Sequence, residues 1–284
     1  MLRTIRDNNS IHYIVLIALC LCSSLMLCLF LPPAHAAKRR EQPYCVVDSY
    51  KTPGAAYRIV NREPHVFFER RLGSISSIAL YNGRLYFCSI NDKRIYLREG
   101  QQERVVFEHG TYVRDISVDL NGNLYFSQAS GANGDGKIYK LSPPVDELGS
   151  KQQFSISKEE RPIWIYLKTV DGFWSGDFTF DSQGNLYLST GNRIPGFIYK
   201  VQREENGKYG FPRKSYQDTK GVIKGIAIDP SNLHFVYYVD WDRTIYKLDI
   251  SNLRRSVEFS GNISRSRDPH LSDVAFDVGI RRKK

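Results

Sequence analysis

Three aspartates recur at one position of a repeated strand motif and have the chemistry to bind a divalent cation. The motif occurs as ISSIALY, VRDISVD, SGDFTFD, IKGIAID and LSDVAFD, starting at residues 75, 113, 175, 223 and 271. Its third position holds Ser77, Asp115, Asp177, Gly225 and Asp273. If the repeats meet at an axis, the three carboxylates converge, and they repel unless a cation or protons neutralise them. Because hard cations prefer oxygen ligands, the pattern predicts a metal site, with Ca²⁺ as the expected ion.

A structural role is the alternative for these aspartates. An aspartate at the start of a strand can accept a neighbouring backbone N–H, and no metal is then required. Arg114 and Lys224 each stand one residue before the third position, where their charges would neutralise the carboxylates. A metal would supply Lewis-acid polarisation of a carbonyl group, which is hydrolase chemistry. Without a metal, the same face would bind a ligand or a protein partner, and we assign no catalytic residue.

Further polar residues are expected at the same face. His109 and His270 each precede one of the motifs, and imidazoles titrate near neutral pH. Asn192 and Asp240 follow the second strand of their repeats and could add ligands. The predicted ligand-binding residues are Arg114, Lys224, His109, His270, Asn192 and Asp240.

The elements that would position these residues form a unit of about 40 residues. The motif is followed by a turn such as 119–123, in which glycine supplies a positive φ and aspartate bonds the turn backbone. A second, a third and a fourth strand follow, as at 124–127, 137–140 and 104–107. These short runs are rich in aromatic and β-branched residues, which favour strands. Four antiparallel strands per unit are typical of a β-propeller blade.

The number of blades follows from a tyrosine in the third strand of each unit. These tyrosines are Tyr57, Tyr96, Tyr139, Tyr199 and Tyr246. They predict five blades, and six is the alternative if residues 142–173 contain a degenerate blade. Segments 44–47, 56–59 and 66–69 match a second, third and fourth strand, whereas 271–277 matches a first strand. We therefore expect the two ends of the chain to share one blade, which removes open sheet edges.

The units resemble those of the NHL and SMP-30/gluconolactonase-like propellers and, more loosely, the YWTD propellers. The resemblance is carried by GIAIDPSNLHF at 225–235, DSQGNLY at 181–187 and VYYVDWDRTIY at 236–246. It implies a β-propeller that is either a binding or scaffold protein or a lactonase-type hydrolase. In the lactonases a divalent ion lies at the axial mouth, and one ligand matches the third-position aspartates. The chain departs from that pattern at Lys224, where lactonases usually place an amide.

The first 36 residues have the features of a signal peptide. Arg3 and Arg6 precede an apolar run over 14–31, and Ala34-His35-Ala36 is a small-x-small cleavage site. This predicts a secreted or periplasmic protein in which 37–284 form one propeller domain. An uncleaved membrane anchor at 14–31 is the alternative.

Charge and cysteine content limit the possible partners. The formal net charge is +10, and basic runs at 38–40 and 281–284 would attract an anionic envelope surface. No nucleic-acid motif is present, and a monomer is expected. Cys45 and Cys88 are the cysteines beyond the apolar leader. The sequence allows two alternatives, a disulfide between them or two free buried thiols.

Overall fold

The architecture is all-β, as the sequence predicts. The computed structural model describes residues 44–48, 54–70, 73–89, 93–128, 135–145, 153–158, 160–166, 176–191, 194–241, 243–260 and 271–278. Every named element within these ranges is a β-strand. None of the described residues forms a helix long and apolar enough to cross a membrane. The predicted leader, residues 1–36, lies outside the described ranges.

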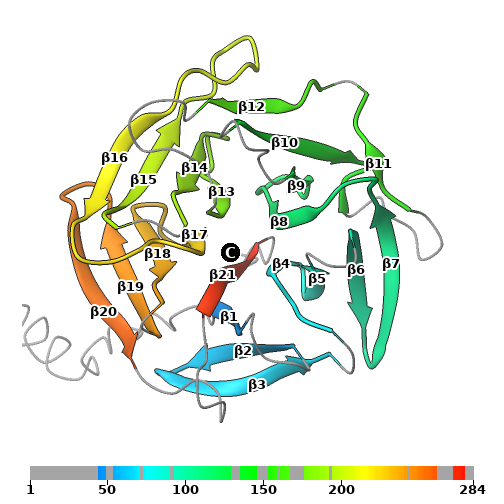
Figure 1. The fold of residues 1–284 in the computed structure, drawn as a ribbon, viewed down its shortest axis with the longest axis horizontal. Coiled ribbons are helices and arrows are strands. Elements are labelled where there is room, and N and C mark those ends of the chain that lie inside the picture. Colours follow the sequence, from blue (N-terminus) through cyan, green and yellow to red (C-terminus); the bar gives the residue numbers. More distant parts are fainter. Residues whose placement is uncertain are drawn as a thin grey trace, which may run out of the picture. The chain divides into compact units, whose positions relative to one another are not determined.

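The largest sheet joins the two ends of the described chain. Its strand order is β3-β2-β1-β21-β4-β5-β6-β7 (Figure 1). The strands are β1 (Tyr44–Asp48), β2 (Ala55–Val60), β3 (Glu63–Glu69), β4 (Ser77–Tyr81), β5 (Arg84–Ser89), β6 (Arg94–Glu99), β7 (Gln102–Glu108) and β21 (Leu271–Val278). β21 pairs antiparallel with β1 from Tyr44↔Phe276 to Asp48↔Leu271, whereas its parallel pairing with β4 involves only Asp277↔Leu80 and Val278↔Tyr81. The sheet is thus two four-stranded antiparallel sheets that touch at one short junction.

The remaining strands form three further antiparallel sheets. The first contains β8 (Val113–Val118), β9 (Leu124–Gln128), β10 (Asp135–Ser142), β11 (Ser155–Ile156) and β12 (Ile163–Tyr166). The second contains β13 (Phe178–Phe180), β14 (Leu186–Ser189), β15 (Gly196–Val201) and β16 (Arg213–Asp218). The third contains β17 (Ile226–Ile228), β18 (Phe235–Val239), β19 (Thr244–Asp249) and β20 (Arg254–Ser260). Both β11 and β12 pair with β10, so these short strands extend an existing sheet.

The predicted aspartate turns connect first and second strands. Asp119 Oδ1 accepts the backbone N–H groups of Asn121 and Asn123, each at 2.9 Å. Asp181 Oδ1 repeats this arrangement with Gln183 and Asn185 at 3.0 and 2.8 Å. Gly122 lies in the middle of the first turn at φ 78°, a conformation that glycine adopts without strain. The predicted turn role of these acids is confirmed.

The hydrophobic core lies between neighbouring sheets. The described residues form five buried clusters, and each draws side chains from two sheets. Successive residues of a second strand enter different clusters: Tyr237 joins one that includes β21, whereas Tyr238 joins one that includes β15. Because side chains alternate across a strand, each sheet buries both faces against its neighbours.

The first strands of the sheets line the centre of the arrangement (Figure 1). β4 contacts β8, β8 contacts β13, β13 contacts β17, β17 contacts β21, and β21 contacts β4. Four-stranded antiparallel sheets that pack face to face around a centre define a β-propeller. Each of the five sequence motifs overlaps one of these inner strands, so the fold brings the third positions of the motifs to the centre.

Candidate functional site

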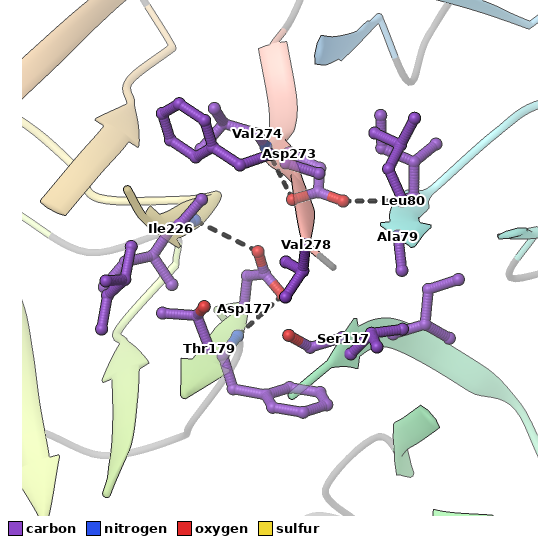
Figure 2. Close-up of a pocket in the computed structure, with 17 residues that line it drawn as sticks. Ala79, Leu80, Ser117, Asp177, Thr179, Ile226, Asp273, Val274 and Val278 are labelled. Atoms are coloured by element: carbon purple, nitrogen blue, oxygen red, sulfur yellow. Dashed lines mark hydrogen bonds between the residues drawn. The ribbon is translucent and has the colours of Figure 1, made fainter. Parts of the chain in front are cut away.

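Two of the predicted aspartates link neighbouring inner strands (Figure 2). Asp273 on β21 accepts the N–H of Val274 at Oδ1 (2.6 Å) and the N–H of Ile78 on β4 at Oδ2 (2.7 Å). Asp177 accepts the N–H of Phe178 at Oδ1 (2.7 Å) and the N–H of Ile226 on β17 at Oδ2 (3.1 Å). All four carboxylate oxygens therefore accept a backbone N–H, half of them from the next sheet.

The other third positions connect strands differently. Ser77 Oγ accepts the N–H of Ile116 at 3.1 Å, which joins β4 to β8. Asp115 Oδ2 accepts a hydrogen bond from Ser127 Oγ at 3.1 Å and lies 3.6 Å from the Nε of Arg114. Gly225 has no side chain, and a Cβ there would lie 2.4 Å from the Cα of Asp273. The glycine thus allows β21 to approach the backbone next to β17.

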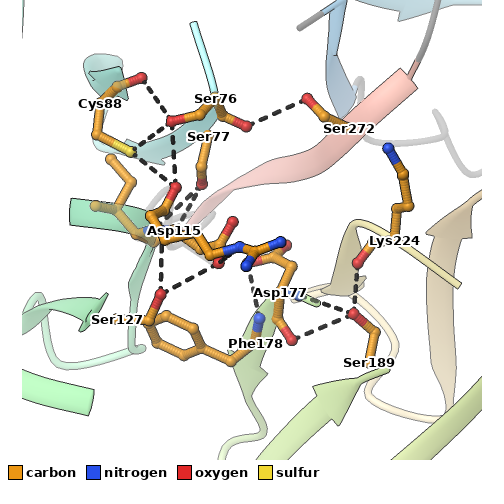
Figure 3. Close-up of polar contacts among 12 residues, drawn as sticks. Ser76, Ser77, Cys88, Asp115, Ser127, Asp177, Phe178, Ser189, Lys224 and Ser272 are labelled. Atoms are coloured by element: carbon orange, nitrogen blue, oxygen red, sulfur yellow. Dashed lines mark hydrogen bonds and ion pairs between the residues drawn. The ribbon is translucent and has the colours of Figure 1, made fainter. Parts of the chain in front are cut away.

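A second row of small polar side chains supports this arrangement, and our sequence analysis did not identify it. Ser189 Oγ accepts the N–H of Asp177 at 2.8 Å and donates to the carbonyl of Lys224 (Figure 3). Cys88, at the equivalent place on β5, donates its Sγ–H to the carbonyl of Arg114 at 3.3 Å. Ser127 is the third member of this row. The signal was present in the endings LYFC, LYFS and LYLS of the second strands.

Cys88 is a free, buried thiol. The disulfide to Cys45, one of two possibilities left open by the sequence, is therefore absent. The thiol of Cys88 takes the place that a serine hydroxyl takes in the equivalent strands.

Burial raises the pKa of each carboxyl group at the centre. Burial raises the pKa of Asp115 to about 7, opposed by the Arg114 charge and reinforced by Asp273. Burial also raises the pKa of Asp177 well above its usual range, and the charges of Asp273 and Asp115 add to this rise. The pKa of Asp273 is raised by burial, although hydrogen bonds from Asp177 and the backbone oppose the change. Protons can therefore relieve the repulsion among these acids.

Asp177 and Asp273 line a small cavity at the centre (Figure 2). Its volume is about 30 Å³, and the rest of its lining is largely apolar, including Ile78, Ile226 and Val274. A cavity of this size holds roughly one or two water molecules. An organic substrate does not fit within it.

The fit of a metal ion depends on the donor oxygens. Among the described residues, no group of three or more His, Cys, Asp or Glu side chains is arranged to hold a metal ion. The oxygens of Asp177 and Asp273 already accept backbone N–H groups, which would compete with a cation. The metal site at Asp115, Asp177 and Asp273 stays a prediction.

The predicted ligand-binding residues have different surroundings. Lys224 Nζ lies 4.8 Å from the ring centroid of Trp241, and burial together with the Arg114 charge lowers the pKa of Lys224 to about 8. Asp240 is buried, and its Oδ1 accepts the N–H of Thr244 at 3.0 Å, which stabilises the β18–β19 connection. His109 accepts from Thr111 at Nδ1. Asn192 and His270 lie outside the described residues.

His109 packs among aromatic side chains. Its ring centroid lies 5.1 Å from that of Phe126 and 5.8 Å from that of Tyr139. Its ring contacts come from β7, β9 and β10, and its place at the same face as the aspartates stays a prediction.

The stability of the protein is expected to fall as the pH rises from about 4 to 7. The unfolded chain loses the Asp115 proton near pH 3.9, whereas the native state keeps it up to about pH 7. The native state then binds more protons in this window, so the free energy of unfolding decreases by on the order of 1 kcal/mol per pH unit. Urea denaturation at pH 4.5 to 8 measures this slope.

The Asp115→Asn variant provides the test of the assignment. Its amide oxygen can still accept from Ser127 Oγ, but the side chain no longer titrates. We expect the slope to become shallower in this variant than in the wild-type protein. Equal slopes in wild type and Asp115→Asn would contradict the raised pKa.

The strand order and packing define the class of the protein, which is a β-propeller. No protein-family model and no curated protein matches the sequence. A chain of a nidogen/laminin complex matches in structure with 13% identity and a TM-score of 0.49, covering 82% of this chain and 97% of that one. A protein provisionally named a gluconolactonase matches with 13% identity and a TM-score of 0.49, covering 77% and 72%.

An auxiliary nutrient binding protein from Bacteroides ovatus matches with 13% identity and a TM-score of 0.46, covering 82% of this chain and 62% of that one. At these identities the similarity concerns the fold alone. The assignment to the β-propellers rests on the strand pairing and packing of the chain itself.

Proposed function

We propose that the chain is a five-bladed β-propeller that binds a ligand or a protein partner at its axial mouth. In this proposal β21 completes the blade formed by β1, β2 and β3. The contact circuit of the inner strands supports the count, because it returns from β21 to β4. The five core clusters among the described residues support it as well, since each lies between two consecutive blades.

One observation carries the binding function: partly exposed cationic and aromatic side chains lie at strand ends next to the aspartates of the centre. We define the mouth by Arg114, Lys224 and Trp241, which lie where β8 and β17 begin and β18 ends. The Arg114 side chain is 28% exposed and Trp241 is 41% exposed. Asp177 and Asp273 bond the backbone, whereas the three mouth residues are partly exposed and can be reached by a partner.

A divalent-metal-dependent hydrolase is the second candidate. It is favoured by one observation, the burial of three mutually interacting carboxyl groups. In that case Asp115, Asp177 and Asp273 would hold the ion, with Ca²⁺ expected, and the ion would polarise a carbonyl group.

Metal analysis of the purified protein distinguishes the two candidates. For the binding function we expect no stoichiometric metal after dialysis and no increase in melting temperature with Ca²⁺ or Zn²⁺. Asp177→Asn should then contain as little metal as wild type, and Asp181→Asn, in a turn, serves as the matched control. Stoichiometric metal that is lost in Asp177→Asn but kept in Asp181→Asn would overturn the binding proposal in favour of the hydrolase.

The proposal also includes export of the protein. Cleavage after Ala36 would release residues 37–284 as a secreted or periplasmic monomer, and the basic ends would face an anionic envelope surface. N-terminal sequencing of the protein from the culture medium or periplasm tests the cleavage, and an N-terminus that retains residues 14–31 supports the anchor instead.

A further inference from the structure

The connection between β15 and β16 is a hairpin of residues 202–212. Within it Arg203 pairs with Tyr209, and the N–H of Glu204 donates to the carbonyl of Lys208 at 2.8 Å. The connections β2–β3, β6–β7 and β19–β20 are shorter, at 61–62, 100–101 and 250–253. The β13–β16 sheet thus carries additional chain at this end, beyond what is needed to join two strands.

The hairpin is fixed on the turn between β13 and β14. The hydroxyl of Tyr209 donates to the carbonyl of Gly184 at 3.1 Å, and the N–H of Arg203 donates to Asn185 Oδ1 at 3.0 Å. A Cβ at Gly184 would lie 3.2 Å from both Cδ and Nη1 of Arg203. The glycine therefore leaves the space in which the arginine side chain lies.

A polar cavity lies between the hairpin and the turns 119–123 and 181–185. Its volume is about 70 Å³, more than twice that of the central cavity, with room for roughly five water molecules. Leu120, Phe180 and six residues with polar side chains line it, the latter being Asp119, Asn121, Asp181, Gln183, Arg203 and Tyr209. Because Asp119 follows β8 whereas Arg114 lies where β8 begins, this cavity is at the opposite end of the strand from the mouth.

The two carboxylates of the cavity are already used by the protein. Besides two backbone N–H groups, Asp119 accepts from Asn123 Nδ2 at 2.8 Å and from the Tyr125 hydroxyl at 3.2 Å. Asp181 likewise accepts from Asn185 Nδ2 at 2.9 Å. A carboxylate has about four acceptor sites, so these oxygens have little capacity left for a bound cation.

An anion is disfavoured by the remaining charge of Asp119. Lys200 Nζ lies 3.6 Å from Asp181 Oδ2 and balances that carboxylate. Lys140, which also follows the third-strand tyrosine of its sheet, pairs instead with Glu160 at 2.7 Å. Asp119 therefore keeps its negative charge without this lysine, and it would repel a bound anion.

The groups that can still bond are neutral or point donors into the cavity. Among the described residues, the guanidinium of Arg203 and Nε2 of Gln183 have no hydrogen-bond partner. The Tyr209 hydroxyl uses its proton on Gly184 and keeps its oxygen as an acceptor. Hydroxyl groups match such a mixture because each can both donate and accept. The partly buried ring of Tyr209 adds an apolar surface.

We propose that the hairpin 202–212 and the turns 119–123 and 181–185 form a binding site for a neutral sugar ring. The hydroxyl groups of the sugar meet Arg203 and Gln183, and its C–H face packs on Tyr209. The sugar is either a free monosaccharide or the end of a glycan chain. This site is separate from the mouth and does not depend on the function proposed there.

Saturation-transfer NMR of the purified protein tests the site, because weak affinity is expected for a ligand that makes few contacts. The free-sugar arm uses glucose, galactose and mannose. The glycan arm uses the methyl glycosides of the same hexoses, in which the anomeric oxygen is substituted as in a chain. We expect signal from at least one hexose in one arm. Retained binding of its methyl glycoside identifies a glycan end, and loss of binding identifies a free sugar.

Charged sugars test the preference for a neutral ligand. At pH 6 glucosamine is cationic and glucuronate is anionic, and both keep the pyranose ring. We expect each to bind no more tightly than glucose, since a cation meets Arg203 and an anion meets Asp119. Cyclohexanol, with one hydroxyl group, should bind at least tenfold more weakly than the hexose that binds best.

Variants assign the binding to the named residues. We expect Arg203→Gln to weaken sugar binding about tenfold and Gln183→Ala about fivefold, because hydrogen bonds to the hydroxyl groups are lost. Lys208→Gln is the matched control, since it removes a positive charge from the same hairpin at a residue that does not line the cavity. Both Arg203 and Lys208 are exposed, so their variants should keep the wild-type melting temperature.

Three results would overturn the sugar site. They are absence of signal from all hexoses and methyl glycosides, at least tenfold tighter binding of glucosamine or glucuronate than of glucose, and unchanged affinity in folded Arg203→Gln. Equal loss of affinity in Arg203→Gln and Lys208→Gln would also contradict it, because the effect would then be one of overall charge. None of these results bears on the metal analysis, so the sugar site and the function of the mouth can fail independently.

Discussion

A chain that ends at residue 270 is expected not to fold cooperatively, because it lacks β21. This strand buries Leu271, Val274 and Phe276, each at most 3% exposed, between β1 and the β17–β20 sheet. Burial of each large apolar side chain contributes about 1.5–3 kcal/mol. Their combined loss approaches the total stability of a typical protein, which is about 5–15 kcal/mol. Circular dichroism and urea denaturation of the purified truncated protein measure the effect.

A second truncation, after Val278, is the matched control. It removes the basic end of the chain but retains β21, so we expect a melting temperature within about 2 °C of the full-length protein, as is usual for changes away from the core. A cooperative unfolding transition of unchanged midpoint in the chain that ends at 270 would contradict closure of the propeller through β21. Adding a peptide of residues 271–278 should restore cooperative unfolding if the missing strand is the sole cause.

The sequence predicted the all-β propeller architecture because the relevant signals are local. Turn residues such as Asp119 and Gly122 bond or bend the adjacent backbone and show their role within a few positions. Short continuous runs of aromatic and aliphatic residues, such as the run that contains Tyr237 and Tyr238, indicate strands that are buried on both faces. The pairing of β21 with β1 depends on residues more than 200 positions apart, and only the repeat allowed it to be expected.

The roles of the third-position residues required the structure. Asp177 and Asp273 have the same type and repeat position as possible metal ligands, and their sequence context does not reveal what their oxygens accept. The N–H groups of Ile78 and Ile226 come from other sheets, so their availability depends on the distance between blades. Cys88 illustrates the same limit, since its hydrogen bond to the Arg114 carbonyl crosses from one sheet to the next.

The difference among third positions also has a physical reason. Asp273 reaches β4 with its carboxylate, so the space between β17 and β21 must accommodate the backbone of Asp273 itself. Gly225 fulfils this requirement where Ser77 and Asp177 use side chains. The repeat is therefore irregular where the backbone of Asp273 comes close to Gly225, and a sequence alignment alone does not reveal this requirement.

Gly225→Ala is accordingly expected to destabilise the protein by about 3 kcal/mol or more, at or above the upper end of typical overpacking costs. The added Cβ would lie 2.4 Å from the Cα and 2.8 Å from the carbonyl carbon of Asp273. These are backbone atoms, which cannot move aside as a flexible side chain can. For a protein of this size the melting temperature should fall by about 6–12 °C, measured by calorimetry.

Gly210→Ala is the control for the general effect of adding a methyl group. Its nearest neighbour would be the Gln202 carbonyl oxygen at 3.7 Å, an ordinary contact, so little change in melting temperature is expected. Gly225→Asp restores the residue of the other repeats and should be more damaging than Gly225→Ala, because it adds a buried charge to the same clash. If Gly225→Ala had the same melting temperature as Gly210→Ala, the backbones of Gly225 and Asp273 would be farther apart than in the structure. The acidic centre would then lack the geometry that links its carboxylates to the neighbouring strands.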